Sequence, residues 1–517
     1  MNLKKYISKN YLLNDFAVIF YLAIFKLLLH LLTNTIYNFH RDEFLYIEMG
    51  KHIDWGYVEV PPLIGIYSKI AGDLLGGSLF AYRFLPALSG AIIVLLTGLM
   101  VKEMGGKRYA QILAAVSVIL SPLYLRTGTL FQPVPFDQLY WLLGAYLLIR
   151  ILNRNETKMW ILFGLVCGLG LLNKYTMLLF GFGVFIGLIL SVQRKYFLSK
   201  KFWIAGGISL IIFLPNLIWQ HQNDWVVFEF ISALGSQQLV NFDPFGFVLT
   251  QVFFVWMAFP IALLGLYFFF FSKSGKNYRP LGWIYFSSFL ILLFLSGKHY
   301  YLGPTYPMLL AGGAVMIQRW IEKKHRHWFK PAIVGLLIFF SLGIFPYGLP
   351  ILPFPQLEKY VKYMADNYGL AEALRWEDGK LHRLPQDYAD MTGWENQVAH
   401  VAKVYHNLPP EEQGKCVLWC SNYGGAGAVN YYRKKYDLPR AITLAGSFYT
   451  WGPGELPGEI VIALGFDKDD FGNWQNVDLA TTIKHEYARE EKMPVWICRN
   501  PKKTLQELWP DWKRYRF

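Results

Sequence analysis

The chain has 517 residues, of which 54% are hydrophobic and only 17% are charged, and its formal net charge is +14. Soluble proteins carry roughly 25% charged residues, so this composition argues against an ordinary soluble protein and for a membrane protein. Most basic residues fall in short loops between apolar segments, where membrane topology accounts for them. We therefore expect membrane lipids, and not nucleic acid, as partners.

Eleven apolar segments precede residue 350, and we predict that each is a membrane helix of roughly 17–25 residues. They cover 16–33, 79–101, 109–125, 135–151, 159–173, 175–192, 202–219, 245–271, 281–297, 300–318 and 329–349. Lys4, Lys5 and Lys9 come before the first segment, but no small-residue cleavage site follows it, so we interpret it as a retained helix and not a signal peptide. Lys26 lies inside this helix, and the sequence gives no reason for it.

The charges of the loops predict the orientation of the chain. With the N-terminus in the cytoplasm, the inner segments hold 21 Lys and Arg residues and the outer segments only six, which is the positive-inside pattern. An odd number of spans then places the C-terminal segment outside the cell. We predict a transmembrane domain over 1–350 and a soluble extracytoplasmic α/β domain over 351–517.

Two regions outside the predicted spans have residue patterns that predict secondary structure. In the first outer loop, 34–78, the segment PPLIGIYSKIAGDLLG has apolar residues at helical spacing, which predicts a helix in the membrane interface. In the C-terminal segment, buried strands are predicted for VLWC, IVIALGF and VWICR, and a helix for NQVAHVAKVYHNL. The run NYGGAGA at 422–428 predicts a tight glycine turn, and an anion site at a helix N-terminus is the weaker interpretation.

An acidic cluster follows the first predicted helix. Asp42 and Glu43 come directly after His40 and Arg41, and Glu59 follows in the segment WGYVEVPP. A carboxylate at such a place can accept the proton of a hydroxyl nucleophile. The alternative is a solvated loop in which Asp42 caps the next helix.

Cationic residues gather at the predicted outer ends of the helices, where a charge is costly without a partner. Their side chains could bind an anionic group such as a phosphate, and neighbouring tyrosines could line a lipid or a sugar. The alternative is an interfacial belt of snorkelling lysines and amphipathic tyrosines. The candidates are Arg83, Arg126, Lys174, Lys298, His299, Tyr300 and Tyr301.

Several motifs, in their order along the chain, resemble the bacterial branch of the dolichyl-phosphate-mannose protein mannosyltransferase family, which has the GT-C membrane fold and counts the lipid A aminoarabinose transferase as a relative. The motifs are Arg41-Asp42-Glu43, WGYVEVPPLIG at 55–65, RFLPALSG at 83–90, GLLNKYT at 170–176, GKHYYLGPTYP at 297–307, DMTGWENQV at 390–398, NYGGAGAVNYY at 422–432 and TWGPGE at 450–455. The resemblance covers nearly the whole chain.

The resemblance implies transfer of a sugar from a polyprenyl-phosphate donor to an acceptor hydroxyl on the outer face. The acceptor would be a glycolipid such as lipid A, a cell-envelope polymer or a protein. Asp42 matches the position of the catalytic base, Glu43 is its neighbour, and Glu59 matches an acidic position before the Pro-Pro step. Val60 stands where family members often have His, and TLAGSFYTWGP replaces a commoner SGHNSYxxWGP form.

Such a transfer would be a single displacement that inverts the anomeric centre, with the cationic residues stabilising the charge on the leaving phosphate. We expect no required cofactor, although clustered carboxylates at Asp42, Glu43 and Glu59 also suit Mg²⁺ or Ca²⁺. Two other functions stay open. One is a transporter or flippase for lipid-linked sugars, and the other is a non-catalytic subunit that binds the carrier lipid.

Overall fold

The structure is a computed structural model that describes residues 14–237 and 242–515, so that Lys4, Lys5 and Lys9 lie outside the described residues. The chain forms two compact units. The helical unit comprises the described residues up to Asn34 together with Phe80–Asp224 and Gly235–Ile351. The mixed unit comprises Thr35–Leu79, Trp225–Leu234 and the described residues from Leu352 onward. The predicted first outer loop therefore clusters with the C-terminal segment.

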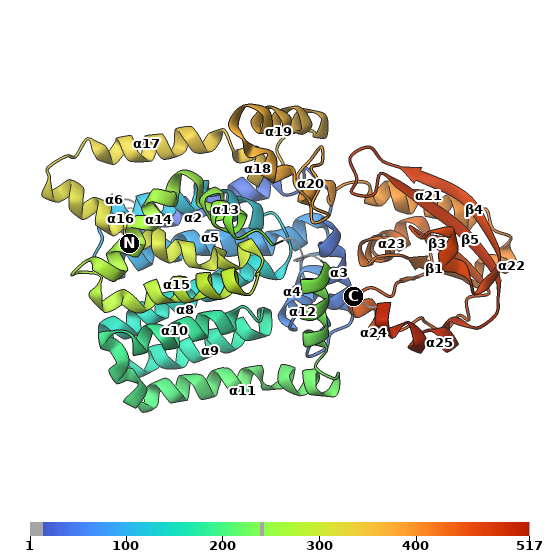
Figure 1. The fold of residues 1–517 in the computed structure, drawn as a ribbon, viewed down its shortest axis with the longest axis horizontal. Coiled ribbons are helices and arrows are strands. Elements are labelled where there is room, and N and C mark those ends of the chain that lie inside the picture. The colour runs from blue at the N-terminus through green and yellow to red at the C-terminus, as the bar shows by residue number, and fades with distance from the viewer. Residues whose placement is uncertain (1–13, 238–241, 516–517) are drawn as a thin grey trace, which may run out of the picture. The chain divides into compact units, whose positions relative to one another are not determined.

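The helical unit consists of helices joined by short loops (Figure 1). Each of the eleven predicted apolar segments coincides with one of these helices or with a pair of them. The elements are α2 (Asp15–Thr33), α5 (Leu79–Glu103), α6 (Arg108–Leu120), α7 (Pro122–Thr127), α8 (Pro133–Arg154), α9 (Thr157–Asn173), α10 (Met177–Ile189), η2 (Val192–Leu198), α11 (Lys200–Gln222), α13 (Pro244–Val255), η3 (Trp256–Ala258), α14 (Phe259–Phe271), η4 (Lys276–Tyr278), α15 (Arg279–Phe294), η5 (His299–Thr305), α16 (Tyr306–Lys323), α17 (Phe329–Leu342) and α18 (Phe345–Gly348).

Two of the predicted helices that the structure divides have a clear local reason for the break. The segment 109–125 divides into α6 and α7 because Ser121 is extended, as the residue before a proline usually is, and Pro122 starts a new helix. The segment 245–271 divides into α13 and α14 at Trp256, whose φ of +46° places it in the left-handed region. A residue with a Cβ seldom adopts this conformation, so the helix cannot continue through it.

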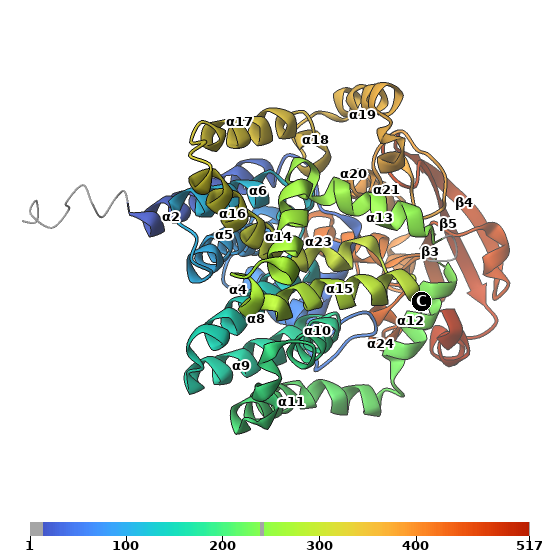
Figure 2. The same ribbon diagram turned by 60° about the vertical axis from the view of Figure 1, so that its left-hand side comes forward.

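Glycines bring pairs of these helices close together. Between α14 and α16, a Cβ added at Gly313 would lie 1.9 Å from the carbonyl oxygen of Ile261. Between α10 and α15, which Figure 2 shows side by side, a Cβ at Gly187 would lie 2.7 Å from the Cα of Pro280. Close backbone approach through small residues is a main source of helix association in membranes.

By length and composition, four of the described segments are able to cross a membrane: Asp15–Thr33, Leu79–Glu103, Lys200–Gln222 and Pro244–Phe271. A fifth is the pair Met177–Ile189 and Val192–Leu198, which is bent by 110°. These apolar helices support a membrane location. The count of eleven spans and the orientation stay predictions.

The structure gives Lys26 a role. Its buried ammonium group donates a hydrogen bond of 3.0 Å to the carbonyl of Tyr124, and His30 Nε2, one turn further along α2, lies 2.9 Å from the carbonyl of Leu125. Both carbonyls belong to α7, which has only six residues and ends before it can supply their helical N–H donors. The two polar side chains of α2 therefore provide hydrogen-bond partners for carbonyl groups at the C-terminal end of α7, where no helical N–H reaches them.

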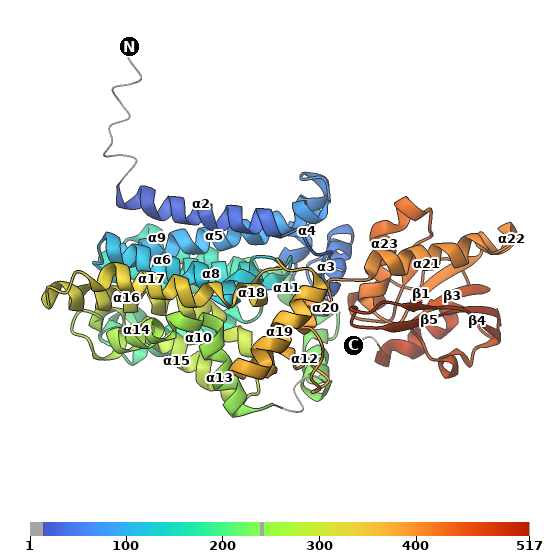
Figure 3. The same ribbon diagram turned by 90° about the horizontal axis from the view of Figure 1, so that it is seen from above.

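The mixed unit combines helices with one five-stranded sheet (Figure 3). Its elements are α3 (Arg41–Lys51), α4 (Leu63–Asp73), α12 (Val226–Gln237, most of which belongs here), α19 (Phe354–Tyr368), η6 (Leu370–Leu374), α20 (Gln386–Ala389), α21 (Trp394–His406), α22 (Pro410–Gln413), β1 (Cys416–Cys420), α23 (Tyr423–Tyr436), β2 (Ala441–Ile442), α24 (Ser447–Thr450), β3 (Ile460–Leu464), η7 (Lys468–Phe471), β4 (Trp474–Lys484), β5 (Lys492–Pro501), α25 (Leu505–Leu508) and η8 (Pro510–Tyr515). The helix α4 lies where the first outer loop predicted one.

The sheet has the strand order β2-β1-β3-β5-β4. β1 pairs in parallel with β2 and β3, whereas β5 is antiparallel to β3 and β4. Figure 3 shows α21 and α23 together along one side of the strands, and on the sheet Trp419 and Val461 pack with Leu505 of α25. The three predicted strands and the predicted helix of the C-terminal segment are confirmed.

Candidate functional site

The helix α3 starts at the acidic cluster, and its first turn is held by a reciprocal cap. His40 is the N-cap: its Nδ1 accepts from the N–H of Asp42 at 3.1 Å, while its own N–H donates to Glu43 Oε2 at 2.7 Å. Glu43 is fully buried. The capping role that the sequence allowed for Asp42 is therefore filled by His40 and Glu43, which leaves the Asp42 carboxylate available for another contact.

The Asp42 carboxylate meets a residue that is distant in the sequence. Its Oδ1 accepts a hydrogen bond of 2.8 Å from the hydroxyl of Tyr423, the first residue of α23. The guanidinium of Arg41 lies 5.0 Å from the centre of the Tyr423 ring, a distance suited to a cation–π contact. Asp42 is half-buried, at the positive end of the α3 dipole.

The glycines of NYGGAGA are helical and not part of a turn, so the predicted glycine turn is wrong. Asn422 caps α23 by accepting the N–H of Gly425 at 2.9 Å, and the glycines then lie in the first turns of the helix. A Cβ at Gly427 would lie 2.6 Å from the Cβ of Phe44, and one at Gly424 would lie 2.6 Å from Cγ of Arg41. The glycines thus let α23 pack directly against α3, which brings Tyr423 to Asp42.

Glu59 is held by α24. Its Oε1 accepts from the N–H of Ser447 at 2.8 Å and its Oε2 from the Ser447 hydroxyl at 2.5 Å. Burial and the charge of Asp42 raise the pKa of Glu59, although both hydrogen bonds act in the opposite direction. Gly446 has a φ of +57°, and a Cβ there would lie 1.7 Å from Oε1 of Glu59. The variant segment TLAGSFYTWGP therefore keeps a polar contact with Glu59 through Ser447.

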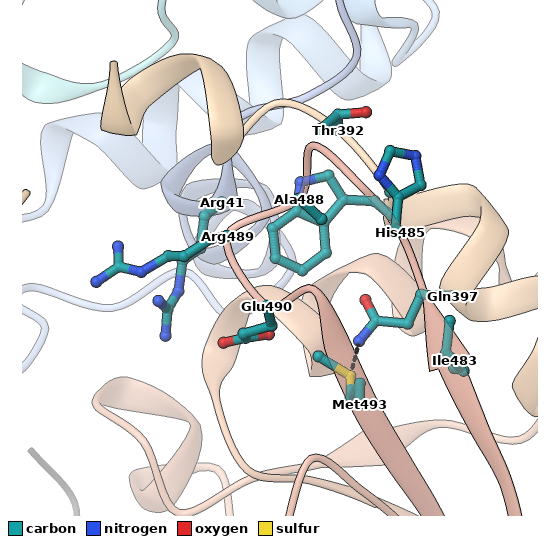
Figure 4. Close-up of a pocket in the computed structure, with 11 residues that line it drawn as sticks. Arg41, Thr392, Gln397, Ile483, His485, Ala488, Arg489, Glu490 and Met493 are labelled. Carbon is teal, nitrogen blue, oxygen red and sulfur yellow. Dashed lines mark hydrogen bonds between the residues drawn. The ribbon is translucent and has the colours of Figure 1, made fainter. Parts of the chain in front are cut away.

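A small cavity lies beside Arg41 (Figure 4). Its lining includes Arg489 and Glu490, and Figure 4 shows both of these residues and Arg41 on one side of the cavity's lining, away from His485 and Ile483. Arg489 donates to Asp390 Oδ2 at 3.2 Å, and the Arg41 N–H donates to the Asp390 carbonyl at 3.0 Å. The volume of about 30 Å³ fits a water molecule and not a sugar.

In the helical unit, four of the predicted phosphate-binding residues form a group that we call the lysine–tyrosine cluster: Lys174, Lys298, Tyr300 and Tyr301. The Lys174 ammonium lies 4.4 Å from the ring centre of Tyr301 and 5.0 Å from that of Tyr300. It also interacts electrostatically with Lys298 and with Asp137. A cation beside two aromatic rings, with a second cation close enough to interact with it, suits an anionic headgroup.

The other predicted phosphate-binding residues are placed differently. Arg83 is fully buried and donates to the carbonyl of Asn34, whose side chain donates back to the Arg83 carbonyl at 3.1 Å. A phosphate would have to displace Asn34 to reach it. Arg126 lies half-buried in α7, and the His299 ring packs 5.4 Å from that of Phe247.

Sequence reasoning missed Tyr423, Ser447 and Glu48. Tyr423 lies in the segment NYGGAGA, whose glycines suggest a turn. Ser447 lies in TLAGSFYTWGP, which departs from a commoner form of that motif. Glu48 is buried in α3, where it accepts from Asn430 at 3.2 Å and from Arg440 at 3.4 Å. Nothing in the sequence around Glu48 separates it from an ordinary helix-surface glutamate.

Comparison with known proteins bears on the whole chain. Residues 59–219 match the family model described as dolichyl-phosphate-mannose-protein mannosyltransferase, and no curated protein matches the sequence. The solved structure of ArnT from Cupriavidus metallidurans bound to undecaprenyl phosphate is 14% identical, with 95% of this chain and 98% of that chain covered and a TM-score of 0.60. Its apo form is also 14% identical, with 89% and 94% covered and a TM-score of 0.60. The predicted resemblance is confirmed, and the fold is that of a GT-C protein.

Proposed function

We propose that this chain, which has the GT-C fold and matches the protein mannosyltransferase family model over 59–219, is an inverting glycosyltransferase of the bacterial cytoplasmic membrane. It would move a sugar from a polyprenyl-phosphate donor to an acceptor hydroxyl on the outer face. The observation that supports this most is the Asp42 carboxylate, which is released from capping α3 and oriented by Tyr423. A carboxylate held in this way is suited to act as a general base.

The reaction needs one base and one site of positive charge. Asp42 takes the proton of the acceptor hydroxyl, whose oxygen attacks the anomeric carbon of the donor sugar. The bond from that carbon to the phosphate oxygen breaks from the opposite side, so the lipid phosphate leaves with the bonding electrons and the configuration inverts. The lysine–tyrosine cluster would stabilise the negative charge that develops on the phosphate.

Glu43 and Glu59 are better suited to support than to chemistry. Glu43 closes the cap of α3, and both oxygens of Glu59 accept hydrogen bonds from Ser447. Among residues 14–237 and 242–515, no group of three or more His, Cys, Asp or Glu side chains is placed to hold a metal ion. We propose that Asp42 acts as base without a metal, which a transfer assay with and without EDTA would test.

The central test replaces Asp42 by Asn, which keeps the size of the side chain and removes its basicity. Mass spectrometry of envelope glycolipids and glycoproteins from cells with and without the gene would identify the product. Asp42→Asn should lower its formation by at least roughly 100-fold, because a general base contributes about that much or more. Asp73→Asn is the control: this exposed carboxylate on α4 pairs with Lys69 at 2.8 Å and should leave activity unchanged.

The outcomes separate the candidate functions. Full activity of Asp42→Asn would refute Asp42 as base. If the wild type makes no product but binds undecaprenyl phosphate, the non-catalytic carrier-lipid subunit is favoured. If it moves lipid-linked sugar across vesicles without transferring it, the transporter is favoured.

A further inference from the structure

The proposed base receives its hydrogen bond from the other end of the sequence. Tyr423 and Asp42 are 381 positions apart, yet the Tyr423 hydroxyl donates to Asp42 Oδ1 at 2.8 Å. Within the described part of the chain, Asp42 Oδ2 has no hydrogen-bond partner. One carboxylate oxygen is therefore fixed, and the other is available to accept a proton.

Three features hold Tyr423 at this place. Asn422 caps α23, so the orientation of its first residue is set by the helix axis. Gly424 and Gly427 allow α23 to contact Arg41 and Phe44 without an intervening side chain. The guanidinium of Arg41 then lies over the Tyr423 ring, which restricts the ring and keeps its hydroxyl directed at Asp42.

A second carboxylate of the same unit also accepts hydrogen bonds from the C-terminal segment. Glu59 is held by Ser447 of α24, and Ser447 also accepts from the N–H of Val58 at 3.1 Å. The C-terminal segment thus supplies a hydrogen-bond donor to each of two carboxylates of the segment 35–79, from two separate helices. Packing alone would not need a hydroxyl at both places.

We infer that Tyr423 is a positioning residue for the transfer reaction: its hydroxyl fixes the rotamer of Asp42, the carboxylate that must accept the proton. The C-terminal segment would then be part of the catalytic apparatus and not only a site for acceptor selection. This inference rests on the proposed function, because it assigns Tyr423 a role through Asp42.

The test is Tyr423→Phe, which keeps the ring and removes the hydroxyl. The matched controls lie on the same helix: Tyr431→Phe loses a hydrogen bond to the Gly77 carbonyl, and Tyr432→Phe loses one to Asn38, both 3.1 Å in the wild type. Product formation is followed in membrane vesicles from the expressing cells, which contain the native donor and acceptor. Wild type, Asp42→Asn and the double variant Asp42→Asn/Tyr423→Phe are measured in parallel.

We expect Tyr423→Phe to lower the rate at the pH optimum roughly 5- to 10-fold through loss of orientation. In the Asp42→Asn background, adding Tyr423→Phe should lower the residual rate no further, because Tyr423 acts through Asp42. Tyr431→Phe and Tyr432→Phe should keep the wild-type rate. The dependence on Asp42 is the decisive reading, since a loss of folded protein lowers the rate in either background.

Two kinds of failure are distinguishable. If Asp42→Asn loses most of its activity and Tyr423→Phe has the rate of its controls, the role of Tyr423 is overturned and the base assignment survives. If Asp42→Asn is active, or the wild type makes no product, the proposed function itself fails. Melting of each purified variant, followed by tryptophan fluorescence, verifies that Tyr423→Phe folds as Tyr432→Phe does.

Discussion

The contact between α23 and α3 can be tested by adding one methyl group. In Gly427→Ala, the new Cβ would lie 2.6 Å from the Cβ of Phe44 and 3.1 Å from its carbonyl carbon and oxygen. The carbonyl atoms belong to the α3 backbone and the Cβ is attached directly to it, so none of them can rotate away and α23 must shift. Overpacking of this kind costs about 1–3 kcal/mol, against a helix-propensity gain of about 0.5–1 kcal/mol. The net loss of stability is about 0.5–2 kcal/mol.

A loss of that size lowers Tm by roughly 1–8 °C in a unit of about 200 residues, and the shift of α23 should lower transfer activity by withdrawing Tyr423. Tryptophan fluorescence of the purified protein during heating measures the first effect. Gly335→Ala is the control, since Gly335 is also helical but a Cβ there meets no atom within 4 Å, so its Tm should stay equal or rise. If Gly427→Ala is as stable and active as the wild type, the close packing of α23 on α3 is refuted.

Two further predictions concern charge. Lys298→Ala should weaken undecaprenyl phosphate binding by about 10-fold, the size of one charge-assisted contact. Lys69→Ala on α4 is the control and should bind as the wild type does. If Lys298→Ala and the wild type have equal Kd values, Lys298 is not part of the site. Burial raises the pKa of Glu59, so the folded state holds this proton more tightly, and the contribution of Glu59 to stability is fully present at low pH and declines as pH rises through that raised value. The Tm of Glu59→Gln minus that of the wild type should therefore increase between about pH 4 and pH 7, and a flat or falling difference would contradict the burial of the charge.

The helices were predictable because each depends on a local run of apolar residues. The positions of α2, α5 and α11 follow directly from such runs, and α21 and β3 follow from periodicity. The interruption at Trp256 was predictable only in part: Pro260, four residues later, cannot donate to the Trp256 carbonyl, but the positive φ of Trp256 is one that its residue type disfavours.

Of the hydrogen-bonded pair Asp42 and Tyr423, only Asp42 was predictable from the sequence. Asp42 was identifiable because a carboxylate beside a membrane needs an explanation, and a resemblance gave it a role. Tyr423 was not, because its partner is 381 positions away and the glycines beside it suggest a turn as readily as a helix interface. For the same reason Arg83 looked like a phosphate ligand: its bond to Asn34 exists only in the folded chain.

The link from Lys26 to Tyr124 also constrains how the protein enters its membrane. The two residues are 98 positions apart, so at about 5–20 residues per second the first helix is synthesised roughly 5–20 s before its partner carbonyl. A lone lysine at the centre of a membrane helix costs about 2.5–3.5 kcal/mol on insertion scales. The hydrogen bond that offsets this cost forms only after α7 has been synthesised. Stable insertion of α2 is thus coupled to the arrival of a helix almost one hundred residues further along the chain.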